Sequence, residues 1–134
     1  MTTLLAFTIS TPGYHDLAAE CAERIRKYAN VDCLILTSND RENGHSLKFD
    51  LPKLAGGRVF LFMDADAFLI RPLSLDKFIG MDGAAFVPDP AALHPTFCQN
   101  DADVFGFPRE RYCNTGVFLA ISAVSRVIRA FDRA

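Results

Sequence analysis

Long apolar runs and an excess of positive charge are both absent from this 134-residue sequence. The apolar run at residues 59–63 ends at an aspartate and is far shorter than the ~20 residues that a membrane-spanning helix requires. The N-terminus has no basic segment of the kind that opens a secretory signal peptide, so we expect a cytoplasmic protein. Fourteen Lys and Arg against sixteen Asp and Glu give a net charge of −2, so we expect no nucleic-acid partner.

Several motifs with well-known chemistry are absent too. The four cysteines form no C-x-x-C pair, so a structural zinc site is not expected, and Cys21 and Cys33 lie in apolar patterns typical of core residues. The sequence has no P-loop and no G-x-G-x-x-G, so neither of these nucleotide-binding loops is expected. It has no G-x-S-x-G, so a hydrolase with a serine nucleophile turn is not supported. Half of the residues are hydrophobic and 22% are charged, which is typical of one folded domain, here predicted over residues 1–134.

The first half of the chain alternates between strand and helix patterns. Short runs of apolar and β-branched residues predict strands at 4–10 and 31–37, and apolar residues at helical spacing predict a helix at 14–29. The nearly continuous apolar run at 58–63 is typical of a strand buried on both faces. The fold class predicted is therefore α/β, with a mostly parallel sheet flanked by helices. The remaining predictions are a polar loop at 38–44, a helix at 47–54, strands at 84–87 and 116–121, a long loop at 88–111 and a helix at 122–134.

Two carboxylates follow the strand predicted at 58–63. Asp64 and Asp66 are separated only by Ala65, at the carboxyl end of a strand, where open α/β sheets bind their ligands. Such a pair can hold one hard divalent cation, and the cation can neutralise charge on a diphosphate. A second Asp-Ala-Asp at 101–103 lies in the predicted long loop with no strand before it, so we expect a solvated loop there.

The surroundings of the first pair resemble a known family. The segment KFDLPKLAGGRVFLFMDADAFLIRPL, residues 48–73, resembles the central region of family 8 of the GT-A glycosyltransferases, the glycogenin and lipopolysaccharide galactosyltransferase group. Residues 87–90 (VPDP) and 112–118 (YCNTGVF) resemble later segments of that family, and 7–14 (FTISTPGY) is similar to its first strand and nucleotide loop. The resemblance implies a GT-A fold and metal-dependent binding of a nucleotide-sugar, with a UDP-sugar as the expected donor and a hydroxyl group as the acceptor.

For the phosphate end of the donor, the resemblance implies a set of charged residues. Asp64 and Asp66 would hold Mn²⁺ or Mg²⁺ between the two phosphates, with Ala65 in the same binding loop. Lys48 stands sixteen residues before Asp64, as in the family, and would approach the sugar or the phosphates. The alternative for Lys48 is a solvated charge on a helix.

For the base and the sugar, the resemblance implies a second set. Ile9 and Thr11 would line the base pocket, and Tyr14 would stack on the uracil ring. Asn114 and Thr115 would contact the donor sugar or the acceptor. The alternatives are a packing residue at a helix start for Tyr14 and a turn cap for Asn114.

The sequence departs from the family in one respect. Family members supply a third metal ligand from a His-x-x-Gly-x-x-Lys-Pro segment, whose Lys also binds the diphosphate. None of His15, His45 and His94 has a Gly three residues later, and His94 is the only substitute we consider. A non-catalytic GT-A-like module that binds a nucleotide, a sugar or a protein partner is therefore an alternative to the transferase.

Two further expectations complete the sequence analysis. Haloacid-dehalogenase phosphatases also place D-x-D after an apolar strand, but their motif has Thr or Val where Phe68 stands, and it lies on the first strand of the domain. This phosphatase is the less favoured alternative. The helix predicted at 122–134 has an apolar face, and a sheet with little covering exposes hydrophobic surface, so we expect a homo-oligomer.

Overall fold

The computed structural model describes residues 4–80, 83–88 and 113–120. Residues 89–111 of the loop predicted at 88–111, which include His94 and the second Asp-Ala-Asp, lie outside this described part, as does the helix predicted at 122–134. The elements in chain order are β1 (Leu4–Ser10), α1 (His15–Ala29), β2 (Cys33–Thr37), α2 (Arg41–Ser46), η1 (Leu47–Asp50), α3 (Leu51–Ala55), β3 (Val59–Met63), η2 (Asp76–Phe78), β4 (Ala84–Pro88) and β5 (Cys113–Ala120).

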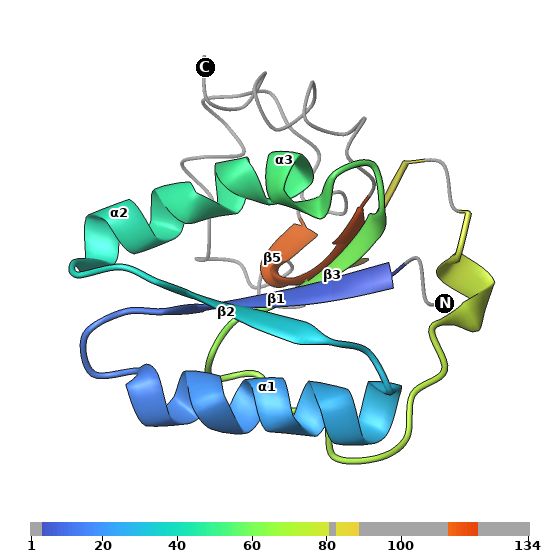
Figure 1. Ribbon diagram of the computed structural model, residues 1–134, viewed down its shortest axis with the longest axis horizontal. Coiled ribbons are helices and arrows are strands. Elements are labelled where there is room, and N and C mark those ends of the chain that lie inside the picture. The colour runs from blue at the N-terminus through green and yellow to red at the C-terminus, as the bar shows by residue number, and fades with distance from the viewer. Residues whose placement is uncertain (1–3, 81–82, 89–112, 121–134) are drawn as a thin grey trace, which may run out of the picture.

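The strands form one five-stranded sheet in the order β2-β1-β3-β5-β4 (Figure 1). β1 is parallel to both β2 and β3, whereas β5 is antiparallel to both β3 and β4. Helix α1 covers one face of the sheet, and α2 and α3 cover the other (Figure 1). The α/β fold class predicted from the sequence is confirmed, and the parallel pairing of β1 with β3 brings their carboxyl ends to one edge.

Residues of β1 alternate between two apolar clusters, one on each face of the sheet. Leu4 and Ala6 belong to the cluster beside α1, and Phe7 and Ile9 belong to the cluster beside α3. All seven residues of β1 are buried. The fully buried Phe7 packs edge-on against Phe60 of β3, with ring centroids 5.9 Å apart, and burying one such ring contributes about 1.5–3 kcal/mol.

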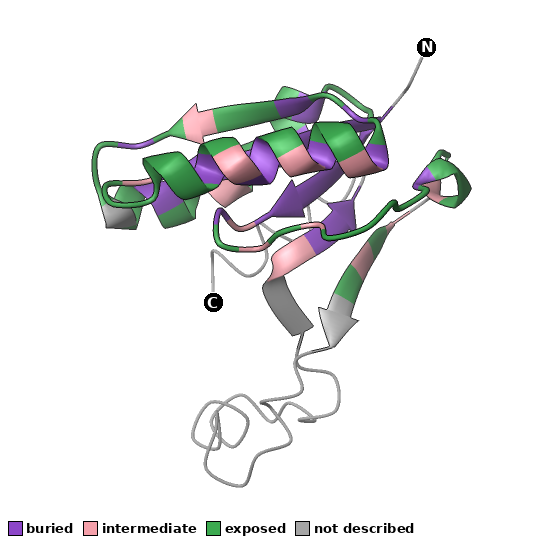
Figure 2. Cartoon of the chain, turned by 90° about the horizontal axis from the view of Figure 1, so that it is seen from below, coloured by how far each residue is buried: buried purple, intermediate pink, exposed green. Residues whose placement is uncertain are grey.

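The strands differ in how far they are covered. β3 is buried along its whole length, as its continuous apolar run predicts, whereas only Cys33 of β2 is buried. Figure 2 shows β2 as a largely exposed strand at the edge of the sheet. Cys21 and Cys33 are buried free thiols, which confirms their prediction as core residues. In the part of the chain that the structure describes, no helix is long and apolar enough to cross a membrane.

The segment between β2 and β3 differs from its prediction. The polar loop predicted over 38–44 is wrong from residue 41 onward, because α2 begins there. Asp40 caps this helix by accepting a hydrogen bond from the Asn43 amide at 2.7 Å, and the helix buries too little apolar surface to leave a periodic pattern. The helix predicted at 47–54 is two pieces, η1 and α3, and Pro52 lies in the first turn of α3, where proline is tolerated.

β5 begins earlier than the strand predicted from residue 116. It starts at Cys113 because residues 113–114 pair with β4, where the register shifts between Phe86 and Val87. The polar residues Asn114 and Thr115 lie at this end of β5, so the sequence has no apolar pattern there that would predict a strand.

Candidate functional site

A loop at the carboxyl end of β3 carries Asp64 and Asp66. The Asp64 amide donates to the carbonyl of Gly116 on β5 at 2.6 Å, and the Ala67 amide donates to the Asp64 carbonyl at 2.9 Å. These bonds tie the loop to the sheet and close it as a tight turn. Ala65 is buried at 6% exposure, which leaves the two flanking aspartates half-exposed and exposed, respectively.

The loop after β1 lies at the same edge of the sheet. It turns between Thr11 and Tyr14, whose amide donates to the Thr11 carbonyl at 2.9 Å. Gly13 adopts a φ of 86°, a left-handed conformation that favours glycine. Below the turn, the hydroxyl of the buried Ser10 hydrogen-bonds His15 Nδ1 and braces the start of α1.

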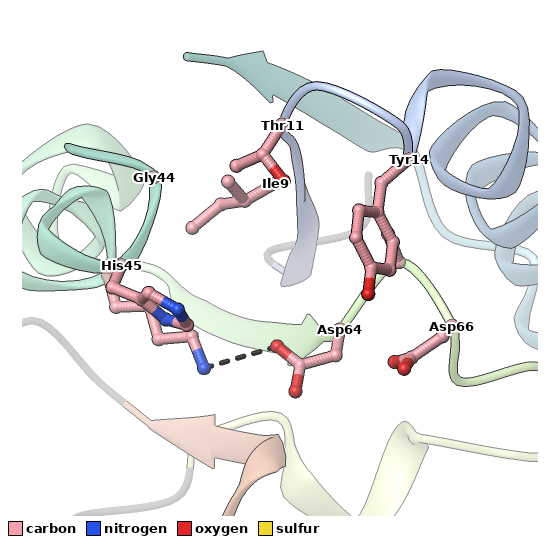
Figure 3. Close-up of a pocket in the computed structure, with 9 residues that line it drawn as sticks. Ile9, Thr11, Tyr14, Gly44, His45, Asp64 and Asp66 are labelled. Atoms are coloured by element: carbon pink, nitrogen blue, oxygen red, sulfur yellow. Dashed lines mark ion pairs between the residues drawn. The ribbon is translucent and has the colours of Figure 1, made fainter. Parts of the chain in front are cut away.

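These two loops and α2–η1 enclose one pocket (Figure 3). Seven of the nine site residues predicted from the sequence line it, together with two that were not predicted. Figure 3 shows Tyr14 and Asp66 on one side of the cavity and Gly44 and His45 on the other. The lining residues are Ile9, Thr11, Tyr14, Gly44, His45, Lys48, Asp64, Ala65 and Asp66.

The other two predicted residues, Asn114 and Thr115, belong to β5. The backbone of Asn114 pairs with Val87 of β4. β5 also carries Gly116, whose carbonyl accepts the hydrogen bond from the Asp64 amide. The side chains of Asn114 and Thr115 lie outside the described part of the structure. Their contact with a sugar or an acceptor stays a prediction.

Charge in the pocket is organised around one ion pair. Lys48 Nζ of η1 lies 3.1 Å from Asp64 Oδ1 (Figure 3). The same ammonium group lies 4.7 Å from the centre of the Phe62 ring. The Lys48 side chain is 20% exposed and that of Asp64 is 42% exposed. Solvent screens such a pair, so its contribution to stability is about 1 kcal/mol at most, and its larger effect is on the charge of the pocket.

Sequence reasoning missed Gly44 and His45 because α2 was expected to be a loop. Gly44 is buried, and a β-carbon at this position would lie 2.3 Å from Cγ2 of Thr11. The absence of a side chain therefore lets α2 approach the loop after β1. The signal that could have found this helix is Asp40, a residue type preferred at the N-cap, followed by the acidic Glu42 in the first turn.

Cys21 of α1 lies on the protein side of the carboxylate loop. Its thiol contacts the carbonyl oxygen of Asp64 at 3.7 Å. Burial raises the pKa of the Cys21 thiol. A protonated, buried thiol fits a packing role beneath the loop and no role as a nucleophile or metal ligand.

The carboxylates are a suitable donor set for a hard divalent cation. Mn²⁺ and Mg²⁺ prefer oxygen ligands and keep several water molecules when few protein ligands are present. Over residues 4–80, 83–88 and 113–120, no group of three His, Cys, Asp or Glu is arranged to hold a metal ion. Asp64 and Asp66 therefore fit a cation whose remaining positions are filled by water or phosphate, rather than one held by protein groups alone.

Comparison with known proteins relates the fold of this chain to that of a solved structure. No known family matches the sequence, and no curated protein is similar to it in sequence. The structure is similar to that of the apo form of the glycosyltransferase GlyE from Streptococcus pneumoniae TIGR4, with a TM-score of 0.61 and 12% sequence identity. The match covers 97% of this chain and 37% of that one, so this chain spans just over a third of the GlyE chain. At this identity, the likeness shows that the two share a glycosyltransferase fold.

Proposed function

We propose that this chain is the donor-binding part of a metal-dependent glycosyltransferase, which moves a sugar from a nucleotide diphosphate, expected to be UDP, to a hydroxyl acceptor. One observation carries the proposal. The loops after β1 and β3 bring an aromatic ring, Tyr14, and two carboxylates, Asp64 and Asp66, into one pocket at the carboxyl edge of the sheet. A fold shared with a glycosyltransferase supports the same conclusion.

The β1 side of the pocket suits a nucleobase. Tyr14 is 36% exposed, so its ring is available for stacking, and stacking of a base on an aromatic side chain contributes about 1–3 kcal/mol. Ile9 and Thr11 add an apolar wall and a hydroxyl group next to it. This side of the pocket therefore matches the flat, partly apolar end of a nucleotide-sugar.

The β3 side suits a diphosphate. Asp64 and Asp66 would hold Mn²⁺ or Mg²⁺, and the cation, when bound, would stabilise negative charge that builds on the leaving diphosphate. Lys48 adds a positive charge on the same side of the pocket. Backbone hydrogen bonds from Asp64 to Gly116 and from Ala67 to Asp64 hold the loop from which the two carboxylates extend.

Thermal unfolding and calorimetric titration test the proposal. We expect UDP and UDP-sugars with Mn²⁺ to raise the melting temperature on the order of several degrees, since a ligand at 100 times its Kd stabilises a protein by about 2.7 kcal/mol. Asp64→Asn combined with Asp66→Asn should abolish the rise. The matched control is Asp101→Asn with Asp103→Asn, which changes the second Asp-Ala-Asp and should behave as wild type.

Two outcomes would decide the matter. A cooperative melt that no nucleotide shifts, with or without Mn²⁺, would reject the donor-binding proposal. If UDP-sugars bind, release of UDP in the presence of hydroxyl acceptors tests transfer itself, and binding without release would favour the non-catalytic module.

A further inference from the structure

The position of Lys48 affects how a metal ion would bind in the pocket. Its ammonium group lies 3.1 Å from one oxygen of Asp64, a predicted metal ligand. Its side chain is four-fifths buried, and its charge lies over the ring of Phe62, which is fully buried. Lys48 is therefore held close to the carboxylate by its packing and is not a solvent-exposed side chain that reaches Asp64 by chance.

This placement has an electrostatic consequence. The ammonium group of Lys48 is paired with Asp64 and offsets the negative charge of that carboxylate. A divalent cation at the same carboxylate would lie close to a second positive charge, and the two would repel each other more strongly near the protein surface than in bulk water. Asp66 is exposed and carries the only other carboxylate that lines the pocket among the described residues, so it offsets this repulsion only in part.

A diphosphate changes the balance. Its negative charge would satisfy Lys48 and a divalent cation at the same time, so the two positive groups would no longer oppose each other. Binding of the cation and binding of the diphosphate are then coupled, and the coupling must act equally in both directions.

We propose that Lys48 is a positioning residue that makes metal and diphosphate bind together. As the counter-ion of Asp64, it weakens binding of the metal alone, and it strengthens binding of the metal with a nucleotide diphosphate. This inference rests on the proposed function for its second half only, since competition between Lys48 and a cation needs no nucleotide.

The test measures Mn²⁺ affinity by calorimetry and by the electron paramagnetic resonance signal of free Mn²⁺, first without nucleotide. We expect Lys48→Met, which keeps the length of the side chain but not its charge, to bind Mn²⁺ about tenfold more tightly than wild type. Lys48→Arg keeps the charge and should resemble wild type. Lys53→Met, which removes the same charge from an exposed position on α3, is the matched control and should also resemble wild type.

The second arm adds UDP. With saturating Mn²⁺, we expect Lys48→Met to bind UDP about tenfold more weakly than wild type, so the same substitution has opposite effects in the two arms. Asp64→Asn in the Lys48→Met background should remove the gain in Mn²⁺ affinity. A cooperative thermal melt verifies folding of each variant, and Lys48→Gln replaces Lys48→Met if the latter does not fold.

The outcomes separate this inference from the proposed function. If Lys48→Met and Lys48→Gln bind Mn²⁺ no more tightly than wild type, including the case in which none of them binds it, the counter-ion role is overturned. If wild type fails to bind any nucleotide but Lys48→Met gains Mn²⁺ affinity, the proposed function fails while the competition at Asp64 stands. If UDP affinity is unchanged in Lys48→Met, the coupling is overturned.

Discussion

Gly44 illustrates how a single residue shapes the pocket. A β-carbon there would lie 2.3 Å from Cγ2 of Thr11 and 3.8 Å from Cγ2 of Ile9. We therefore expect Gly44→Ala to lower the free energy of unfolding by about 1–3 kcal/mol, the usual cost of overpacking a filled site, although alanine is the better helix former. It should also weaken UDP binding, because Thr11 must move. Urea unfolding and titration with UDP measure the two effects.

A second substitution identifies the cause. Thr11→Ser removes the methyl group that the new β-carbon would meet, so stability lost in Gly44→Ala should largely return in the double variant. The two positions are in contact, and their effects should therefore not add. Equal losses from Gly44→Ala in the Thr11 and Ser backgrounds would contradict a steric origin.

At the scale of elements, the position of α2 depends on one cap. Asp40 accepts from the Asn43 amide at 2.7 Å and from the Asn43 side chain at 2.6 Å. A six-residue helix has little other local support. We expect Asp40→Ala to destabilise the protein by about 1 kcal/mol and to lower UDP affinity, since α2 carries Gly44 and His45. Chemical denaturation and UDP titration are the measurements.

The control for this prediction keeps the cap. Asp40→Ser retains a side-chain oxygen that can accept from the same amide, so both stability and UDP affinity should stay near the wild-type values. If Asp40→Ser loses as much as Asp40→Ala, the negative charge and not the cap would be the feature that matters.

The elements also differ in how well the sequence predicts them. α1 and β3 were predictable because each buries a full stripe or a full strand of apolar residues, which leaves a clear period. α2 buries almost no apolar surface, so its sequence resembles that of a loop. Its N-cap residue, Asp40, is the main local feature that indicates a helix. The sequence did not predict the antiparallel direction of β5. The residues of a strand indicate whether it is buried, but they do not indicate its direction relative to its neighbours.

At the scale of the whole molecule, the sheet topology explains why most of the residues named from the sequence line one pocket. Residues after β1 and after β3 are about fifty positions apart, yet parallel pairing of the two strands brings their ends together. The family resemblance indicated Ile9, Thr11 and Tyr14, and the parallel pairing of β1 with β3 explains why they lie in one pocket with Asp64. The far wall of the pocket, from Gly44 to Lys48, depends on how α2 and η1 cross the sheet, and a family resemblance indicated Lys48 alone.

The exposed edge of the sheet bears on self-association, which the sequence led us to expect. β2 pairs only with β1 among the described strands, and its Leu34 and Ile35 are 49% and 40% exposed. An apolar edge strand with free backbone groups can pair with another chain. We therefore expect sedimentation velocity to show association that increases with concentration, and Leu34→Lys to reduce it, because a lysine on an edge strand disfavours pairing.

Leu54 provides the matched control for this substitution. It is 48% exposed, nearly the same as Leu34, but it lies on α3 and not on a strand edge. Leu54→Lys therefore makes the same change in charge and removes a similar apolar area without altering the edge. If both substitutions reduce association equally, general hydrophobic contact drives it. If only Leu34→Lys does, association follows the edge of the sheet.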